Sequence, residues 1–209
     1  MKGDVVGARN NALQSLKILE EVLPSPDHPR MANAEATLAD ALVHSGDRDG
    51  VISAMERALS IDRNVYGNDD IQVAIDRGKL AKLFHDAGDT ARASTFVDQA
   101  IAVFDRHTDS HTEHRALACV TKAQLVAKRD PTMASSLHGK AIAILGADKD
   151  GDRLSVALTL LSLAKLHTTT GSVSQAAEAY RQVISLSDAD DQRLTMLKQA
   201  AETELARLR

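Results

Sequence analysis

The chain has 209 residues, 44% of them apolar and 26% charged, a balance typical of a folded soluble protein rather than a disordered one. Its formal net charge of −4 argues against a nucleic-acid partner, and no apolar run reaches the roughly 18 residues that a membrane-spanning helix needs. The single cysteine fits a reducing compartment and the N-terminus does not read as a secretory signal, so we expect a cytoplasmic protein without a membrane partner. Aromatic residues make up only 2% of the chain, so the core must consist of Ala, Leu, Ile and Val, which suits close-packed helices.

Apolar residues recur with the spacing of an α-helix along the whole chain, and no segment keeps the alternation of a β-strand. No linker or low-complexity stretch interrupts this pattern, so we predict a single all-α domain, residues 1–209. The predicted helices cover roughly residues 4–22, 30–45, 48–66, 71–87, 90–106, 113–128, 131–145, 153–170, 173–187 and 189–208.

A short apolar motif ends one helix in every unit of the chain. It reads SLKIL from Ser15, ALSID from Ala58, AIAVF from Ala100, AIAIL from Ala141 and VISLS from Val183. The steps between the copies are 43, 42, 41 and 42 residues. A spacing this regular indicates a repeat protein, in which each unit packs against its neighbours.

Each unit also carries a turn signal. Gly-Asp occurs at Gly46 and again 42 residues later at Gly88, and Gly-Ser follows at Gly171. Glycine tolerates the left-handed conformation that ends a helix, and Asp or Ser then caps the next helix. A Leu-Ala pair lies upstream of each turn, at Leu38, Leu80 and Leu163. Each unit is therefore predicted to contain helix A, a tight turn, helix B and a polar connector.

Helix pairs with Leu-Ala in the first helix, Gly-Asp at the turn and alanines in the second helix resemble tetratricopeptide (TPR) repeats. The period near 42 residues is similar to the longer kinesin-light-chain type, whose connectors carry Asp-His-Pro, as residues 27–29 do here. The resemblance implies a right-handed α-solenoid of antiparallel helix pairs. It places a half repeat at 3–27, repeats at 28–69, 70–110, 111–150 and 151–187, and a C-terminal capping helix at 188–209.

The sequence departs from the TPR pattern at two places. Tyr180 of the last full unit has Met55, Val97 and His138 as its counterparts in the other units, so the aromatic residue is mostly missing. The fourth unit lacks the Leu-Ala pair in register and has Asp130-Pro131 at its turn, where Asp can cap and Pro can begin the helix. Either this repeat is degenerate or its turn is one residue shorter.

Each end of the chain leaves two alternatives open. The first helix has no helix A before it and would expose the apolar face of VVGARNNALQSLKILEEVL. We expect either a fragment of a longer protein, which we favour, or a homodimer through the exposed N-terminal half repeat. The last helix either caps the solenoid or is helix A of a truncated repeat.

The stretch HTDSHTEHR, residues 107–115, would place three histidines on one stripe if it were helical. However, His28 and His111 lie 83 residues apart, which is two repeat steps, so His111 occupies a connector like that of His28. We therefore interpret His111 as a residue capping the next helix, with solvated neighbours, and predict no metal.

Cys119, the only cysteine, is predicted to be a small buried apolar residue. No phosphate loop or nucleophile motif is present, so we predict no cofactor and no enzyme.

The TPR resemblance implies a concave groove lined by the A helices that binds a peptide or a partner protein. Three of its lysines suggest a mildly basic stretch, although ordinary solvated lysines would look the same. We predict a non-catalytic scaffold or adaptor; the alternative is a sensor or regulatory domain of a multidomain signalling protein, such as a kinase, a nucleotide-binding switch or a peptide-responsive regulator. The groove residues transferred from the TPR pattern are Asn33, Ala36, Asp40, Val43, His44, Ile75, Gly78, Lys79, Lys82, His85, Cys119, Ala123, Leu161, Lys165 and Thr168.

Overall fold

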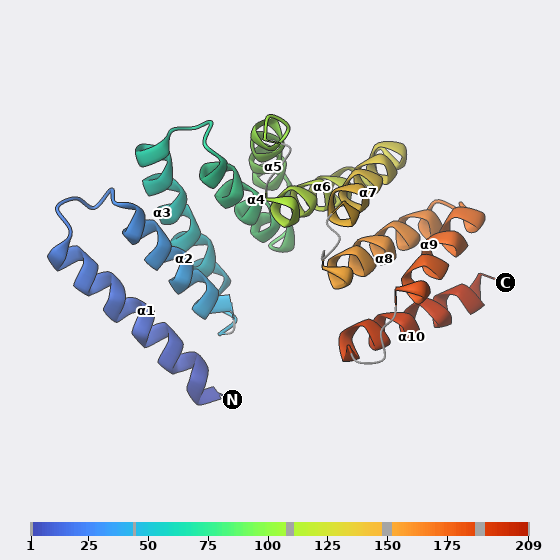
Figure 1. Cartoon of the computed structure of the whole chain (residues 1–209), viewed down its shortest axis with the longest axis horizontal. Helices are drawn as coiled ribbons and strands as arrows, with labels where there is room; N and C mark the ends of the chain where they lie inside the picture. The colour runs from blue at the N-terminus through green and yellow to red at the C-terminus, as the bar shows by residue number, and fades with distance from the viewer. Residues whose placement is uncertain (1, 44, 108–110, 148–151, 187–190, 209) are drawn as a thin grey trace. The chain divides into compact units, whose positions relative to one another are not determined.

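The computed structural model describes residues 2–43, 45–107, 111–147, 152–186 and 191–208, with side chains from residue 6 onward. Within these ranges the chain forms ten α-helices and no strand (Figure 1). The all-α prediction is confirmed, and no helix bound differs from its predicted position by more than three residues. The helices are α1 (Lys2–Val22), α2 (Pro29–Val43), α3 (Arg48–Tyr66), α4 (Ile71–Asp86), α5 (Thr90–Phe104), α6 (Thr112–Val126), α7 (Pro131–Gly146), α8 (Arg153–Thr169), α9 (Val173–Ser185) and α10 (Gln192–Arg207).

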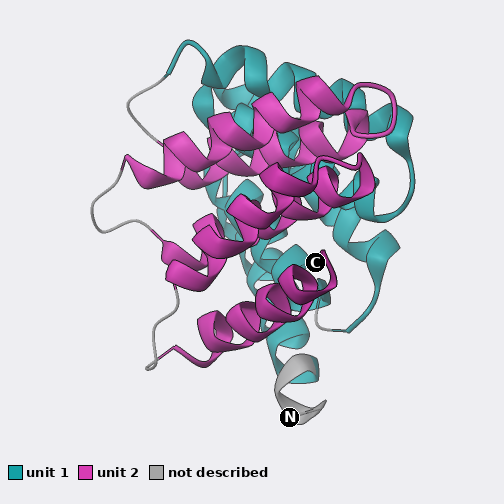
Figure 2. Ribbon diagram, turned by 90° about the vertical axis from the view of Figure 1, so that its right-hand side faces the viewer, with its two compact units in different colours: residues 1–108 teal, residues 109–209 magenta. Residues whose placement is uncertain are grey.

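The chain divides into two compact units, residues 1–108 with α1 to α5 and residues 109–209 with α6 to α10 (Figure 2). In unit 1, α2 packs on α3 and α4 on α5 as helix hairpins, while α1 packs on α2 and α3 on α4. In unit 2, the hairpins are α6–α7 and α8–α9, α7 packs on α8, and α10 packs on α9 and α8. The single domain and the repeat boundaries stay predictions. None of the described helices is both long and apolar enough to cross a membrane.

The predicted glycine turns join the two helices of each hairpin in unit 1. Gly46 has φ 78° and Gly88 has φ 84°, the left-handed region in which a side chain would be strained. The carboxylate of Asp47 then accepts a hydrogen bond from the Gly50 backbone N–H, and that of Asp89 accepts one from the Arg92 backbone N–H, each at 3.0 Å. These bonds satisfy donors that a helix start leaves open, so the turn both ends one helix and begins the next.

The turn of the fourth repeat is one residue shorter than the others. Asp130 caps α7 by accepting a hydrogen bond from the Met133 backbone N–H at 2.9 Å, and Pro131 is the first residue of the helix. Ala123 is fully buried, like the alanine of each Leu-Ala pair, and lies seven residues before this cap. In the other repeats that separation is eight residues, as the pairs Ala39–Asp47, Ala81–Asp89 and Ala164–Ser172 show. Of the two alternatives left by the sequence, the shorter turn is therefore the right one.

Histidine caps one helix at a repeat connector. The Nδ1 atom of His28 accepts a hydrogen bond from the Arg30 backbone N–H at 3.1 Å, directly before α2. His111 occupies the equivalent place before α6, but its side chain makes no capping bond and its φ is 55°, a left-handed value that is uncommon outside glycine. The connector interpretation is confirmed at both positions. The predicted capping role of His111 is wrong, and His28 is the histidine whose side chain caps a helix.

Small residues let the paired helices approach closely. The alanines predicted at the contacts are fully buried in α4, α5, α7 and α8. Few aromatic residues add to this core. In unit 1, Phe84 and Phe104 are buried, and Phe84 stacks on Phe96 with ring centroids 5.5 Å apart; in unit 2, Tyr180 is buried. The core is therefore filled mainly by closely packed small side chains, with few aromatic residues.

We expect Ala81→Leu and Ala100→Leu to destabilise the chain by about 1–3 kcal/mol each, because added methylene groups overpack a helix contact that has no free space. Urea denaturation of the full chain measures this loss. Ala102→Leu, on the exposed side of α5, is the matched control and should leave the midpoint unchanged. Equal midpoints for all three variants would contradict the assigned helix contacts.

A histidine takes the place of an apolar core residue in α7. His138 is 3% exposed, and its Nδ1 atom has no hydrogen-bond partner among the described residues. Burial, helped by the neighbouring His167, lowers the pKa of His138 to about 4. The imidazole is therefore neutral in the folded unit at neutral pH.

Unit 2 should lose stability as the pH falls. Because the folded pKa of His138 is depressed, its contribution is complete above the unfolded value near 6.5 and is lost progressively as the pH falls toward about 4, by up to about 3 kcal/mol. Hydrogen-exchange protection of α7 and α8 in the full chain measures this effect. His138→Met, which copies Met55 of the second repeat, should remove most of the acid-side loss, whereas His107→Gln should not. An unchanged acid-side loss in His138→Met would refute the assignment.

Candidate functional site

The predicted groove residues of α2 lie on one side of that helix. Asn33, Asp40 and Val43 are exposed and Ala36 is half-buried, at positions that share a helix face. Val43 is the most unusual of them, because 55% of this apolar residue is exposed at the end of the helix. His44 lies outside the described residues. The sequence-based choice for α2 therefore gives an accessible surface.

The predicted residues of α4 divide into an accessible and a buried set. Lys79, Lys82 and His85 are half-buried and reach solvent, whereas Ile75 and Gly78 are buried and offer no surface to a partner. Lys82 forms an ion pair with Asp86 one turn later, and the His85 ring lies 3.4 Å from the same carboxylate. Part of the predicted basic character is therefore already neutralised within the helix.

The predicted residues of unit 2 are mostly buried. Cys119, Ala123 and Leu161 have almost no exposed surface, so they cannot form a groove surface in this structure; Lys165 is exposed and Thr168 is half-buried. The physical reason for two of these misplacements is the shorter fourth turn, which shifts the register of α6 by one residue.

Gln124, not Ala123, takes the place in α6 that Lys82 takes in α4, since each follows the buried alanine of its helix. Gln124 is exposed. Cys119 packs with Ala116, Ala141 and Leu145, as the prediction of a buried apolar residue requires. We therefore call the accessible side chains of α2 and α4 the helix-A face of unit 1: Asn33, Ala36, Asp40, Val43, Lys79, Lys82 and His85.

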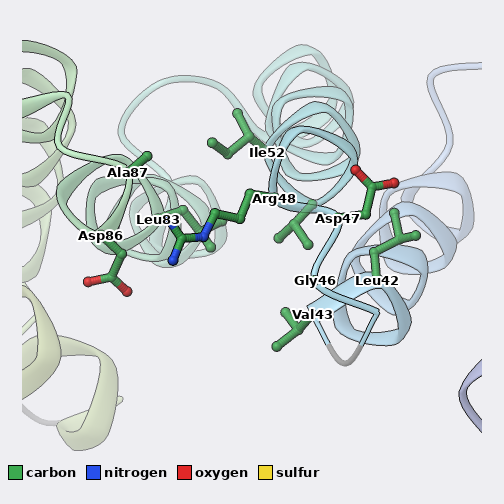
Figure 3. A pocket seen from close by; sticks show the side chains of 10 residues that line it. Leu42, Val43, Gly46, Asp47, Arg48, Ile52, Leu83, Asp86 and Ala87 are labelled. Carbon is green, nitrogen blue, oxygen red and sulfur yellow. The ribbon is translucent and has the colours of Figure 1, made fainter. Parts of the chain in front are cut away.

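A cleft of about 320 Å³ adjoins the helix-A face of unit 1. Its residues come from three places: the end of α2 and the following turn, the first two turns of α3, and the end of α4 (Figure 3). The lining is mainly apolar and its polar groups are few. The cleft is lined by Leu42, Val43, Gly46, Asp47, Arg48, Val51, Ile52, Leu83, Asp86 and Ala87.

The charged residues at the cleft differ in how they are used. Asp47 is committed to capping α3, and Asp86 is paired with Lys82. Arg48 has no side-chain partner among the described residues, and Figure 3 shows its side chain extending from the start of α3 toward Leu83 and Asp86. The cleft thus combines an apolar lining with one guanidinium group that is free to meet an anion or a carbonyl oxygen.

Sequence reasoning found only Val43 of this cleft. Leu83 and Asp86 follow directly after the predicted Lys82 and His85, but residues of the turn were given only a structural role. The signal that could have found the cleft is an arginine directly after the Gly-Asp turn. It stands at Arg48, whereas Thr90 follows the next such turn.

The histidine-rich stretch does not form the helical stripe that would suggest a metal centre. α5 ends at Phe104 and α6 begins at Thr112, so His107 and His111 lie outside the helix that carries His114. The rings of His111 and His114 lie edge to face with centroids 6.4 Å apart. In the part of the chain that the structure describes, no three His, Cys, Asp or Glu side chains gather closely enough to hold a metal ion.

No protein-family model and no curated protein sequence matches this chain. Solved structures do match it. BtubC (BKLC) from P. vanneervenii is 20% identical, with a TM-score of 0.74 over 96% of this chain and 76% of that one. A putative kinesin light chain of Podosopora anserina with nearly identical TPR-like repeats is 19% identical, with a TM-score of 0.69 over 88% of this chain and 87% of that one.

The Cut9–Hcn1 hetero-tetramer of the APC/C contains a further similar chain, 15% identical, with a TM-score of 0.68 over 99% of this chain and 33% of that one. At these identities the likeness concerns the fold and not the activity. The predicted resemblance is confirmed at that level: the chain has the α-solenoid fold of TPR-like repeat proteins.

Proposed function

We propose that this chain is a non-catalytic protein-interaction module, a scaffold or adaptor, that binds a peptide segment of a partner on the helix-A face and cleft of unit 1. The cleft carries the proposal, because an apolar lining beside an exposed polar helix face is the usual composition of a binding site. A volume of about 320 Å³ is at the lower end of the range for small-molecule sites, which is roughly 300–1,000 Å³. It suits one or two side chains of a peptide.

The exposed valine at the mouth of the cleft supports this proposal. Val43 lines the cleft together with Leu42 and Leu83, so a partner side chain that enters the cleft would meet an apolar lining. Arg48 would then orient the segment by hydrogen bonds to a carboxylate or a backbone carbonyl. Lys79 extends the polar surface of the helix-A face of unit 1, and its cation fits a partner with acidic side chains.

The similar structures support a protein partner in a general way, because one of them is part of the Cut9–Hcn1 hetero-tetramer. A net charge of −4 supports the further proposals that the chain binds neither nucleic acid nor an anionic membrane surface. The lack of a phosphate-loop motif in the sequence supports the proposal that it uses no cofactor. A homodimer through the N-terminal half repeat stays a prediction. It is favoured by α1, where Val6, Leu13, Ile18 and Val22 are exposed around the buried Ala12, Leu16 and Leu19.

A sensor or regulatory domain within a multidomain signalling protein is the alternative proposal. It would use the same surface to read a peptide or protein signal, so surface variants do not separate it from a scaffold. A nucleotide-binding or DNA-binding region in the parent sequence would favour the sensor.

A displayed library of random peptides, selected on the immobilised full chain, tests the proposed surface. We expect enriched peptides to lose about tenfold or more in affinity, equivalent to about 1.4 kcal/mol, on Arg48→Glu or Val43→Asp, because each change removes a group that the bound segment would meet. Lys79→Glu should weaken the binding of acidic peptides in particular.

Lys17→Glu, an equally exposed charge reversal on α1, is the matched control and should leave binding unchanged. Circular dichroism and the urea midpoint of each variant verify that it is folded. Peptides that bind Arg48→Glu, Val43→Asp and the unaltered chain equally well would show that the cleft is not the binding site.

A further inference from the structure

Two acidic side chains are buried against each other where α3 packs on α4. Asp62 of α3 is 4% exposed and Asp76 of α4 is 2% exposed. Their carboxyl groups interact with each other, and the side chain of Gln72 interacts with both. The Oδ2 atom of Asp76 has no hydrogen-bond donor among the described residues. Two buried ionised carboxylates repel each other and neither can donate a hydrogen bond, so a proton on one of them favours this arrangement.

The fold does not demand acidic residues at this place. Leu19 and Ala34 occupy the equivalent positions where α1 packs on α2, and Leu145 and Thr159 occupy them where α7 packs on α8. All four of these residues are buried, and none is charged. The aspartate pair is therefore peculiar to the contact between α3 and α4, which we call the α3–α4 joint.

The surroundings of the pair favour the protonated form. Burial, and after it the neighbouring charge of Asp62, raise the pKa of Asp76 to about 7, whereas Lys79 opposes the shift. The pKa of Asp62 is also raised, by burial first and then by Asp70, against hydrogen bonds from Asp76 and Gln72 that lower it. No cation therefore compensates the pair fully.

Charged groups on the two flanking helices have other partners. Glu35 of α2 accepts two hydrogen bonds from Arg57 of α3, the shorter at 2.7 Å. Next to α5, Arg106 pairs with Asp69 at 2.6 Å. Neither Glu35 nor Arg106 contributes to the pKa shifts of the buried aspartates. The charge at the α3–α4 joint therefore depends mainly on whether the aspartate pair carries a proton.

The same two helices build two walls of the cleft. Val51 and Ile52 come from α3, and Leu83 and Asp86 from α4, so the spacing of these helices sets the width of the cleft. We propose that a proton shared by Asp62 and Asp76 holds α3 against α4, and that its loss loosens the joint and weakens partner binding at the cleft. The effect on partner binding rests on the proposed function, whereas the effect of the proton on the packing of α3 against α4 does not.

The direction of the pH effect follows from the raised pKa. A group whose folded pKa lies above its unfolded value contributes stability that is complete below the unfolded value and is lost as the pH rises through the folded value. For Asp76 this window runs from about pH 4 to about pH 7. The α3–α4 joint should therefore be tightest in mild acid and loosest above neutral pH.

Hydrogen exchange of the full chain, expressed as protection factors so that intrinsic exchange rates cancel, tests the joint without any partner. We expect protection in α3 and α4 to fall roughly tenfold or more between about pH 5 and about pH 8. In Asp76→Asn the amide can donate to Asp62 without a titrating proton, so protection should be high and should not change with pH. Asp49→Asn, an exposed change at the start of α3, is the matched control and should behave like the unaltered chain.

Three results would contradict the proposed α3–α4 joint. The first is equal protection of the unaltered chain at about pH 5 and about pH 8, and the second is low protection of Asp76→Asn at both pH values. The third is a return of protection at about pH 8 when Mg²⁺ or Ca²⁺ alone is added, which would make the aspartate pair a cation site.

Peptides selected on the chain then test whether the joint affects binding at the cleft. Their affinity should fall with pH for the unaltered chain and stay constant for Asp76→Asn. If protection follows the expectation while the peptides are insensitive to Arg48→Glu, the proposed cleft is wrong and the joint stands.

Discussion

The close approach of paired helices through alanine is the constraint on which the rest of the structure depends. A chain with 2% aromatic residues cannot fill wide gaps, so its helices must touch at small side chains. Ala81 and Ala123 of two A helices, and Ala100 and Ala141 of two B helices, are fully buried for this reason.

This constraint also decides where a binding surface can lie. The side of each A helix that carries the alanine is occupied by packing, so only the opposite side can carry accessible residues such as Asn33 and Lys79. The cleft forms at the end of the hairpin, where the chain turns at Gly46 and alanine contacts cease. There the apolar residues Val43 and Leu83 are left at a surface rather than within the core.

Local sequence signals made the fold predictable, whereas the binding site has few such signals and was predicted only in part. A glycine turn, an aspartate cap and an alanine contact each act within a few residues, so their spacing located every helix to within three residues. The prediction of groove residues was wrong where distant segments decide burial. The repeat pattern places Ile75 and Leu161 on the groove side of their helices, but neighbouring helices cover both residues. The shorter fourth turn added a shift of one residue, which moved the choice from Gln124 to Ala123. The sequence did not predict the buried pair of Asp62 and Asp76, because an isolated acidic residue on a helix is normally exposed to solvent.

Buried titratable groups give the two units opposite responses to pH. Asp76 in unit 1 has a raised pKa near 7, so its unit is favoured by acid; His138 in unit 2 has a pKa lowered to about 4, so its unit is favoured by neutral or basic conditions. Both groups occupy positions where another repeat carries an uncharged residue, Ala34 for the first and Tyr180 for the second. Between about pH 4 and about 6.5 a rise in pH strengthens one unit and weakens the other, because these windows overlap. No pH is then best for both units, and a change in pH alters their balance of stability even where the stability of the whole chain changes little.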